Sequence, residues 1–419
     1  MRVSRLATIR KQLSTLLWWI GAQGARRSMA SSHRLQYSTR KSIGWMRCDV
    51  QRGVWSRAGF AHGDACPFWD GDGHRAACNE SVHELMSFHP SNVDGCNTNI
   101  FTTASALRTA FIGALGGRAL RIIGDSLSAD HFTYLTRCLL GCNETYPLKQ
   151  TTISLAVPRD RHKWLRGLKD AGFENKTSEE AIFRLRQRHG DVWYRSGCNI
   201  GSNGGHVDFR RLDLFPSDGE TSRHTNQTSK HPRLVEAMIH ALVHLGGIGT
   251  PPREWRSSDI VMMNLGLHPD AWLPQHMDRV LSWWAKGRAV RQAPRFLWRQ
   301  ISPQHWAAPH GKYRTIGDVF NTTRCTQPDA SESISSFLLY DRNITRLVEQ
   351  AGADVLPIFN ATWSRSDNHP PLRKGSVRLR NSAFDRAFAN RTVYDCTHYC
   401  SRGSVLRFWT QALVSWLEE

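Results

Sequence analysis

The sequence predicts an α/β fold in which helices flank a parallel sheet on both faces. Short apolar runs rich in β-branched residues alternate along the chain with longer runs whose apolar residues recur at helical spacing. Strands that alternate with helices pair in parallel, because each helix carries the chain back to the same end of the sheet. At 419 residues the chain is long enough for a substantial core, arranged as one large or two modest domains.

The first strand of this sheet is expected to end at Gly124, where a β-branched run containing Ile122 and Ile123 stops. A glycine gives such a turn backbone freedom that a side chain would deny it. The apolar segment 127–140 follows and predicts a helix. Ser126 therefore stands between the end of a strand and the start of a helix.

The polar, irregular segment 149–231 predicts loops with some helix, inserted into the sheet domain. Because the carboxyl ends of parallel strands lie at one edge, we expect Ser126, Asn264 and Ser302 to share one rim. Regular patterning beyond the insertion predicts a helix at 234–245, a strand at 259–265, a helix after Asp270 through Trp284, a strand at 296–301, a helix at 334–351 and a strand at 355–359.

Residues 1–47 form a basic leader with ten Lys and Arg residues and no acid. Its uncharged part, 12–25, is shorter than the roughly 20 residues of a membrane-spanning helix and fits a signal peptide or a short signal anchor. An organelle transit peptide has a similar composition and remains an alternative. Without the leader, the net charge of +19 falls to +9, from 45 basic and 36 acidic residues. No nucleic-acid-binding motif is present, so we expect no nucleic-acid partner.

Cysteine usage and glycosylation sequons favour the secretory pathway over a cytosolic enzyme with buried free thiols. The ten cysteines are even in number and contain no Cys-x-x-Cys pair. Sequons matter only in the secretory lumen, so we expect a Golgi-resident type II membrane protein or a secreted protein, with the organelle as the alternative. The sequons begin at Asn79, Asn143, Asn175, Asn226, Asn321, Asn343, Asn360 and Asn390.

The segment from Cys48 to Cys96 is rich in Gly, Asp and His and has little helical periodicity. Such a segment buries little core by itself, so disulfides are expected to staple it to the body. We therefore predict a loop-rich subdomain at 48–110, stapled to a catalytic domain at 111–419.

The candidate chemistry lies in two short motifs, Gly124-Asp125-Ser126 and Asp395-Cys396-Thr397-His398. A serine hydroxyl is a weak nucleophile until a neighbouring imidazole takes its proton, and that imidazole needs a carboxylate to fix its tautomer. Asp-x-x-His places acid and base about one helical turn apart, and a surface pair is the alternative interpretation. At a helix N-terminus, free N–H groups are available to stabilise an oxyanion.

These motifs resemble those of the SGNH/GDSL hydrolase superfamily and, more closely, the trichome-birefringence-like (PC-esterase) family of polysaccharide O-acetyltransferases. The likeness runs from Cys48 to the C-terminus. It departs from the family pattern at 129–131 and 266–269, which leaves the substrate and acceptor open. Further stretches match in the same order: Cys48-Asp49-Val50-Gln51-Arg52-Gly53-Val54-Trp55, Cys66-Pro67-Phe68, Arg299-Gln300-Ile301-Ser302-Pro303-Gln304-His305-Trp306 and Asp367-Asn368-His369-Pro370.

The resemblance implies acetyl transfer to hydroxyls of a cell-wall or matrix polysaccharide through an acetyl-serine intermediate on Ser126, His398 and Asp395. It implies no bound cofactor, with an acetyl donor such as acetyl-CoA as co-substrate and a polysaccharide as partner. A polysaccharide or glycan O-acetylesterase with water as acceptor is one alternative, and a carbohydrate-binding protein with a vestigial site is another. Candidate oxyanion or substrate contacts are Gly124, Asp125, Asn264, Gly266, Arg299 and His305.

Three further expectations concern cysteines, aromatic residues and metals. Trp306, Trp363 and Tyr399 lie near the motifs and are candidates for a platform under a sugar ring, with a core role as the alternative. No cluster of His, Cys and Asp has the spacing of a zinc site, so we expect no metal. By the resemblance, Cys325 pairs with Cys396, Cys142 with Cys198, and Cys48, Cys66, Cys78 and Cys96 with one another and with Cys138 and Cys400.

Overall fold

The computed structural model describes residues 49–57, 86–91, 101, 103–142, 150–153, 192–200, 205–212, 239, 243, 255–265, 273–289, 293–306, 322–327, 334–372, 393–400 and 403–419. The predictions made for the leader at 1–47 and for Cys48, Cys66, Cys78 and Cys96 lie outside these residues. So does most of the helix predicted at 234–245, although Ile239 and Val243 are helical and buried.

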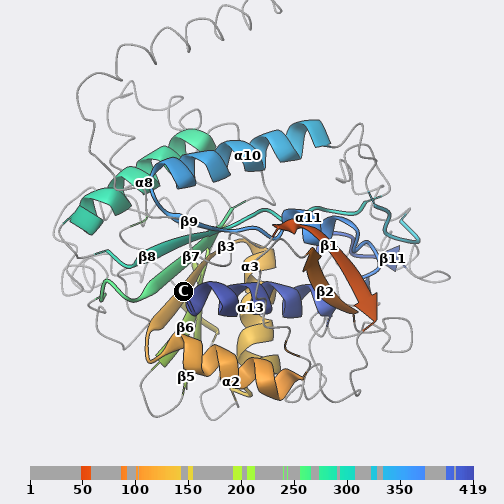
Figure 1. Cartoon of the computed structure of the whole chain (residues 1–419), viewed down its shortest axis with the longest axis horizontal. Helices are drawn as coiled ribbons and strands as arrows, with labels where there is room; N and C mark the ends of the chain where they lie inside the picture. Colours follow the sequence, from red (N-terminus) through yellow and green to blue (C-terminus); the bar gives the residue numbers. More distant parts are fainter. Residues whose placement is uncertain are drawn as a thin grey trace, which may run out of the picture. The chain divides into compact units, whose positions relative to one another are not determined.

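A seven-stranded sheet organises the described residues, in the order β4–β5–β6–β3–β7–β8–β9 (Figure 1). The neighbours β6, β3, β7, β8 and β9 pair in parallel, and β4 and β5 extend one edge in antiparallel fashion. The strands are β3 Ala119–Gly124, β4 Gln150–Ile153, β5 Val192–Ile200, β6 Gly205–Arg211, β7 Ile260–Asn264, β8 Arg295–Arg299 and β9 Asp354–Leu356.

Both faces of the parallel strands are buried, which confirms the predicted α/β class. In β3, Leu120 and Ile122 belong to one hydrophobic core, and Ala119 and Ile123 belong to the other. This alternation follows from the two-residue period of a strand. A strand that is buried on both sides is mainly apolar, and β3 is so apart from Arg121, whose guanidinium is paired with Asp208.

Helices cover the two faces as separate layers (Figure 1). Apolar residues at helical spacing join each layer to its core, among them Phe111 and Leu115 on one side and Met277, Leu281 and Ile344 on the other. The first layer contains α2 Ala104–Leu115, α3 Ser126–Thr133, the π-helix η3 Tyr134–Leu139 and α13 Ser404–Leu417, and the second contains α8 Leu273–Ala289 and α10 Ile334–Gln350.

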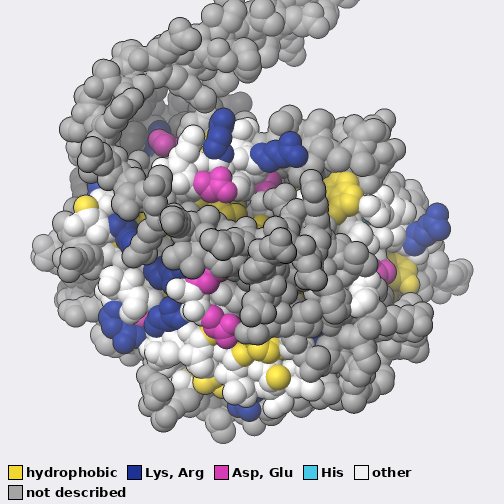
Figure 2. Space-filling model, viewed as in Figure 1, with side chains coloured by type: hydrophobic (Ala, Val, Ile, Leu, Met, Phe, Trp, Pro, Cys, Tyr) yellow, Lys and Arg dark blue, Asp and Glu magenta, His cyan; other side chains and the backbone are white. Residues whose placement is uncertain are grey.

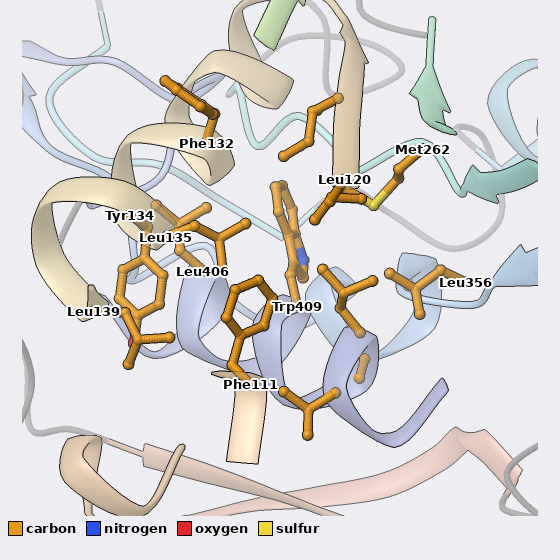
Figure 3. Close-up of a cluster of buried hydrophobic side chains, with 14 of the residues drawn as sticks. Phe111, Leu120, Phe132, Tyr134, Leu135, Leu139, Met262, Leu356, Leu406 and Trp409 are labelled. Carbon is orange, nitrogen blue, oxygen red and sulfur yellow. The ribbon is translucent and has the colours of Figure 1, made fainter. Parts of the chain in front are cut away.

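Trp409 of α13 lies within the first core and joins the helices of that layer to the sheet (Figure 3). Its ring is fully buried and lies among Phe111 of α2, Leu120 of β3 and Leu406 of its own helix. Since α13 is the last helix of the chain, its packing on β3 and α3 brings the C-terminal motifs close to Ser126.

A two-stranded antiparallel sheet, β1 Asp49–Arg57 and β2 Met86–Ser91, packs against this layer. Trp55 and Phe88 contact Phe408 of α13 edge to face, with ring centroids 5.7 and 4.8 Å apart. The Trp55 indole N–H donates to the carbonyl of Ala361 at 2.7 Å. The expectation of a loop-rich segment therefore missed one small sheet, which side-chain packing rather than periodicity fixes in place.

Two sequence-based assignments are wrong. The segment 149–231 contains β4, β5 and β6, and β6 is an inner strand that pairs with β3. The sequence of β6 did not indicate a buried strand, because it contains polar residues such as Asp208. Asp208 is buried in the structure because it forms a bidentate ion pair with Arg121 of β3. The strand predicted at 355–359 ends at Leu356, and the chain enters helix α11, Phe359–Trp363. Residue 110, where the predicted loop-rich subdomain ends, lies within α2.

Among the described residues, none of the helices is both long enough and apolar enough to cross a membrane. On the face shown in Figure 2, basic and acidic side chains of the described residues are interspersed. The described part of this face therefore carries no extended surface of a single charge.

Candidate active site

Ser126 lies where the order of the parallel strands reverses. In chain order these strands are arranged 2-1-3-4-5, so β3 lies between the second and third strands. Ligand sites in such sheets form beyond the carboxyl ends of the strands at this point. Gly124 ends β3, Asp125 is the N-cap of α3 and Ser126 is the first residue of that helix.

Only a glycine fits at position 124. A Cβ atom there would lie 2.3 Å from the hydroxyl of Ser128 and 2.4 Å from the backbone carbonyl of Asn264. This close approach lets α3 begin directly above the ends of β3 and β7. Gly124 is thus a packing residue of the turn that presents the serine.

Ser126, His398 and Asp395 form a continuous hydrogen-bonded row. The Ser126 hydroxyl lies 2.7 Å from His398 Nε2, and His398 Nδ1 lies 2.7 Å from Asp395 Oδ2. The carboxylate accepts from Nδ1–H, which leaves the lone pair of Nε2 facing the serine hydroxyl. This is the arrangement in which an imidazole takes a proton from a serine nucleophile.

The acid and base of this row are accessible from solvent, whereas the serine is nearly buried. The side chains of His398 and Asp395 are 15% and 17% exposed, and Ser126 is 6% exposed. Asp395 also accepts from the backbone N–H groups of Thr397 and His398 through Oδ1. One carboxylate therefore fixes both the main chain and the ring of His398.

The segment that carries His398 is tied to two other parts of the chain. A short antiparallel pair, β10 Pro371–Leu372 and β11 Val393–Tyr394, brings it next to residues 367–370. A disulfide joins Cys396 to Cys325, as the resemblance implied. Cys138, Cys142 and Cys400 are also disulfide-bonded. The base is thus held on a cross-linked segment.

The N-terminus of α3 supplies one backbone donor beside the nucleophile. Asp125 accepts from the N–H groups of Leu127 and Ser128 through Oδ1, and its carbonyl accepts from Ala129 N–H. Within the described residues, the Ser126 N–H has no acceptor. It is therefore the main-chain group best placed to donate to an oxyanion that forms at Ser126. Asp125 has the role of a helix cap.

Asn264 lies at the predicted rim, in register with Gly124, but its amide is already used. Its Nδ2 donates to the backbone carbonyls of Arg299 and Gln300, at 2.8 and 3.1 Å. Asn264 was expected to donate to an oxyanion. In the structure its amide instead links the end of β7 to the end of β8, because it donates to two carbonyls there. Gly266 lies outside the described residues.

Arg299 is fully buried beneath the nucleophile helix. One of its guanidinium nitrogens, Nη2, donates to Ser128 at 3.1 Å, and the guanidinium carbon lies 4.2 Å from the centre of the Trp409 ring. Burial lowers the pKa of Arg299 to about 10, while Asp125 and Asp130 act in the opposite direction. Arg299 therefore supports α3 from below.

His305 is likewise buried, and it pairs with a histidine whose role the sequence left open. Its Nδ1 lies 2.7 Å from His369 Nε2. His369 Nδ1 in turn lies 2.6 Å from the backbone carbonyl of His398. Ser302, also at the rim, donates to the hydroxyl of Tyr399. The motifs at 302–305, 367–370 and 395–400 thus meet behind the triad; their common proximity to His398 could not be read from one sequence.

Two of the three aromatic residues expected to form a platform under a sugar ring are buried in the protein instead. Trp306 is buried and donates to the hydroxyl of Thr397. Tyr399 is fully buried, and its ring stacks on that of His369. Both belong to the support of the catalytic segment, since their polar atoms are used within the protein. Trp363 is half-buried and contacts Phe359.

Comparisons with known proteins add little to this geometry. No family model matches the chain, and no curated protein matches it. A solved structure with some likeness is described as a GDSL-like lipase from Parabacteroides merdae. It has a TM-score of 0.27 and 8% sequence identity, over 71% of this chain and 95% of that chain.

Proposed function

We propose that this chain is a serine-dependent acyl-transfer enzyme, an O-acetyltransferase that acts on a polysaccharide. The observation that carries the proposal is the row of hydrogen bonds from Ser126 through His398 to Asp395 at the strand-order reversal of the sheet. The choice of an acetyl group and of a polysaccharide acceptor comes from the family that the sequence motifs resemble.

In the first half-reaction, Ser126 Oγ attacks the acetyl carbonyl carbon as His398 Nε2 takes the hydroxyl proton. The carbonyl oxygen becomes an oxyanion and accepts from the Ser126 N–H. Asp395 stabilises the imidazolium that forms. Collapse of the tetrahedral intermediate breaks the bond to the leaving group, which takes the proton from His398. An acetyl ester on Ser126 remains.

In the second half-reaction, an acceptor hydroxyl attacks this ester while His398 takes the acceptor's proton. The tetrahedral intermediate collapses, Ser126 leaves with that proton, and the acetyl group stays on the acceptor. With a sugar hydroxyl as acceptor the reaction is transfer, and with water it is hydrolysis. No resident cofactor takes part in the proposed reaction, and the acetyl donor, such as acetyl-CoA, is a co-substrate.

An O-acetylesterase is the second candidate, and one observation favours it. Transfer requires a sugar held beside His398 while water is kept away. Two of the three aromatic residues expected to hold the sugar, Trp306 and Tyr399, are buried in the protein. The side chain of His398 is partly accessible from solvent, which is compatible with water as the acceptor.

Trapping the acyl-enzyme tests the proposal. The protein is mixed with an acetyl donor, quenched and digested, and mass spectrometry locates the added acetyl group. We expect it on Ser126 in the wild type and nowhere in Ser126→Ala, while Ser105→Ala, a change at an exposed serine of α2, retains it. Acetylation that persists in Ser126→Ala would refute the mechanism.

The choice between transfer and hydrolysis is made by varying the acceptor concentration over a panel of deacetylated polysaccharides. For a transferase, acetylated sugar should rise with acceptor concentration at the expense of free acetate, because sugar and water compete for the same acetyl-serine. Free acetate that does not respond to any acceptor would favour the esterase.

The secretory location is part of the same proposal, since polysaccharide acceptors occur in that pathway. Asn343 and Asn360 begin sequons, and both side chains are exposed on helices α10 and α11. We expect endoglycosidase to increase the mobility of the cell-derived protein on a gel, with a smaller increase for Asn343→Gln and Asn360→Gln. No change in the wild type would favour the transit-peptide interpretation.

A further inference from the structure

Two buried histidines lie directly behind the proposed catalytic base. His305 is 0% exposed and His369 is 1% exposed. Their facing nitrogens, His305 Nδ1 and His369 Nε2, are 2.7 Å apart, which is hydrogen-bonding distance. The His369 ring is fixed from a second direction by stacking on Tyr399, with centroids 4.6 Å apart.

The outer nitrogens of this pair both face backbone carbonyls. His305 Nε2 lies 2.9 Å from the carbonyl oxygen of Trp363, and His369 Nδ1 lies 2.6 Å from that of His398. A carbonyl oxygen only accepts, so each outer nitrogen must carry a hydrogen. The contact between the rings needs a third hydrogen. Two neutral imidazoles carry only two hydrogens on their four ring nitrogens. All three hydrogen bonds therefore form together only when the pair holds one extra proton.

The charges around the pair favour that proton. Asp367 and Arg365 act on His305, and Asp395 and His398 act on His369. Arg365 and Asp367 form a bidentate ion pair with each other. The carboxylates of Asp367 and Asp395 and the guanidinium of Arg365 together carry two negative charges and one positive charge. One proton on the histidine pair therefore brings the local charge to zero.

Burial opposes the proton. Burial is the main reason that the pKa is lowered to about 4 for His305 and to about 3 for His369, and repulsion from the His305 ring contributes to the lower pKa of His369. The backbone hydrogen bonds and the two carboxylates act in the other direction. A shared proton also gains the bond between the rings, which neither ring can form alone. Loss of the proton must break one of the three bonds.

We propose that His305 and His369 share one proton and together hold the backbone carbonyl of His398, which makes both of them positioning residues for the triad. The N–H of His398 is held by Asp395 and its carbonyl by His369, so the peptide groups on both sides of the residue are fixed. The positioning role rests on the function proposed above, whereas the shared proton does not.

Counting the protons tests the first part. Histidine-selective ¹⁵N labelling of Ser126→Ala protein, with two-bond ¹H–¹⁵N correlation spectra at neutral pH, reports which ring nitrogens carry hydrogen. His305→Gln and His369→Asn assign the two rings, and His206→Asn, a change at the far end of β6, is the control. We expect three hydrogens on the pair. Two neutral rings, each with one bare nitrogen, would overturn the shared proton.

Kinetics of the full-length protein tests the positioning role. In His369→Asn the amide still donates to the His398 carbonyl, whereas in His369→Leu nothing does. We expect kcat to fall about tenfold in the first and about 10²-fold in the second, because small misplacement of a catalytic group is costly, with KM nearly unchanged. His206→Asn should behave as the wild type. A folded His369→Leu protein with wild-type kcat would overturn the positioning role.

The two failures are distinguishable. If the wild type neither transfers nor hydrolyses acetyl groups, the proposed function fails, and the spectra of Ser126→Ala still decide on the proton. If the wild type is active and the pair proves neutral, the shared proton fails alone.

Discussion

His398 Nε2 lies 2.7 Å from Ser126 Oγ, although 272 positions separate the two residues in the chain. Packing of α13 on α3 and β3 brings the C-terminal segment to the rim, and the Cys325–Cys396 disulfide fixes it there. The distance between nucleophile and base is therefore set by the core and by this cross-link.

Removing any member of the row should abolish the proposed activity without unfolding the protein. Ser126→Ala and His398→Ala are each expected to lower kcat by about six orders of magnitude, because the three residues act as a unit. Asp395→Asn should cost less, about four orders of magnitude, because it leaves His398 in the wrong tautomer. Steady-state kinetics with a chromogenic acetyl ester measures this. Turnover near wild type in Ser126→Ala would exclude a serine nucleophile.

Gly124→Ala should destabilise the protein and reduce activity. The added methyl group meets the Ser128 hydroxyl and the Asn264 carbonyl at 2.3 and 2.4 Å, so α3 must shift. Overpacking of this kind costs about 1–3 kcal/mol. Gly113→Ala is the matched control, because no atom lies within 4 Å of its added Cβ; at this interior position of α2 it should stabilise by up to about 1 kcal/mol. Thermal unfolding compares the two, and equal Tm changes would contradict the packing role.

Removal of the Cys325–Cys396 disulfide should lower both stability and kcat. The double variant Cys325→Ser, Cys396→Ser removes a cross-link between residues 71 positions apart in the chain. Because both cysteines are replaced, neither is left as a free thiol. The expected loss of unfolding free energy is about 2–4 kcal/mol. The segment that carries Asp395 and His398 loses its anchor, so kcat should fall further than stability alone explains. A wild-type kcat at a temperature where the variant is fully folded would show that the anchor is dispensable.

The free energy of unfolding should fall as the pH rises from about 4 to about 7, because of the buried carboxyl of Asp341. Burial raises the pKa of Asp341 to about 7, while its bond from the Ile301 N–H acts in the opposite direction. Between the unfolded and folded pKa values, the unfolded chain loses this proton and the folded protein keeps it, so unfolding is favoured by rising pH.

The variant Asp341→Asn removes this dependence and still accepts from Ile301. It should be more stable than wild type by a few kcal/mol above pH 7, since one pKa unit corresponds to about 1.4 kcal/mol, and little different near pH 4. Denaturant titrations across this pH range measure the difference. Asp278→Asn, a change at an exposed carboxyl of α8, is the control. A constant difference between Asp341→Asn and wild type at all pH values would refute the assignment.

The sequence by itself determined the apolar strands and their order along the chain. The runs that became β3, β7 and β8 are short and mostly apolar, because strands buried on both faces carry few polar side chains. The position of Ser126 followed from the same pattern, since a glycine turn between strand and helix is a local feature. Asp395 and His398 could be named because their spacing is local as well.

Only the tertiary structure decided what depends on partners distant in the chain. Strand β6 was missed because its Asp208 is polar, and its burial is possible only through Arg121 of another strand. Asn264 was expected at an oxyanion until its amide was found bonded to the end of β8. Trp306 and Tyr399 are residue types that can stack on a sugar ring, but both are bonded to other side chains inside the protein. Hydrogen-bond partners and burial are properties of the packed chain, so a single sequence does not contain them in readable form.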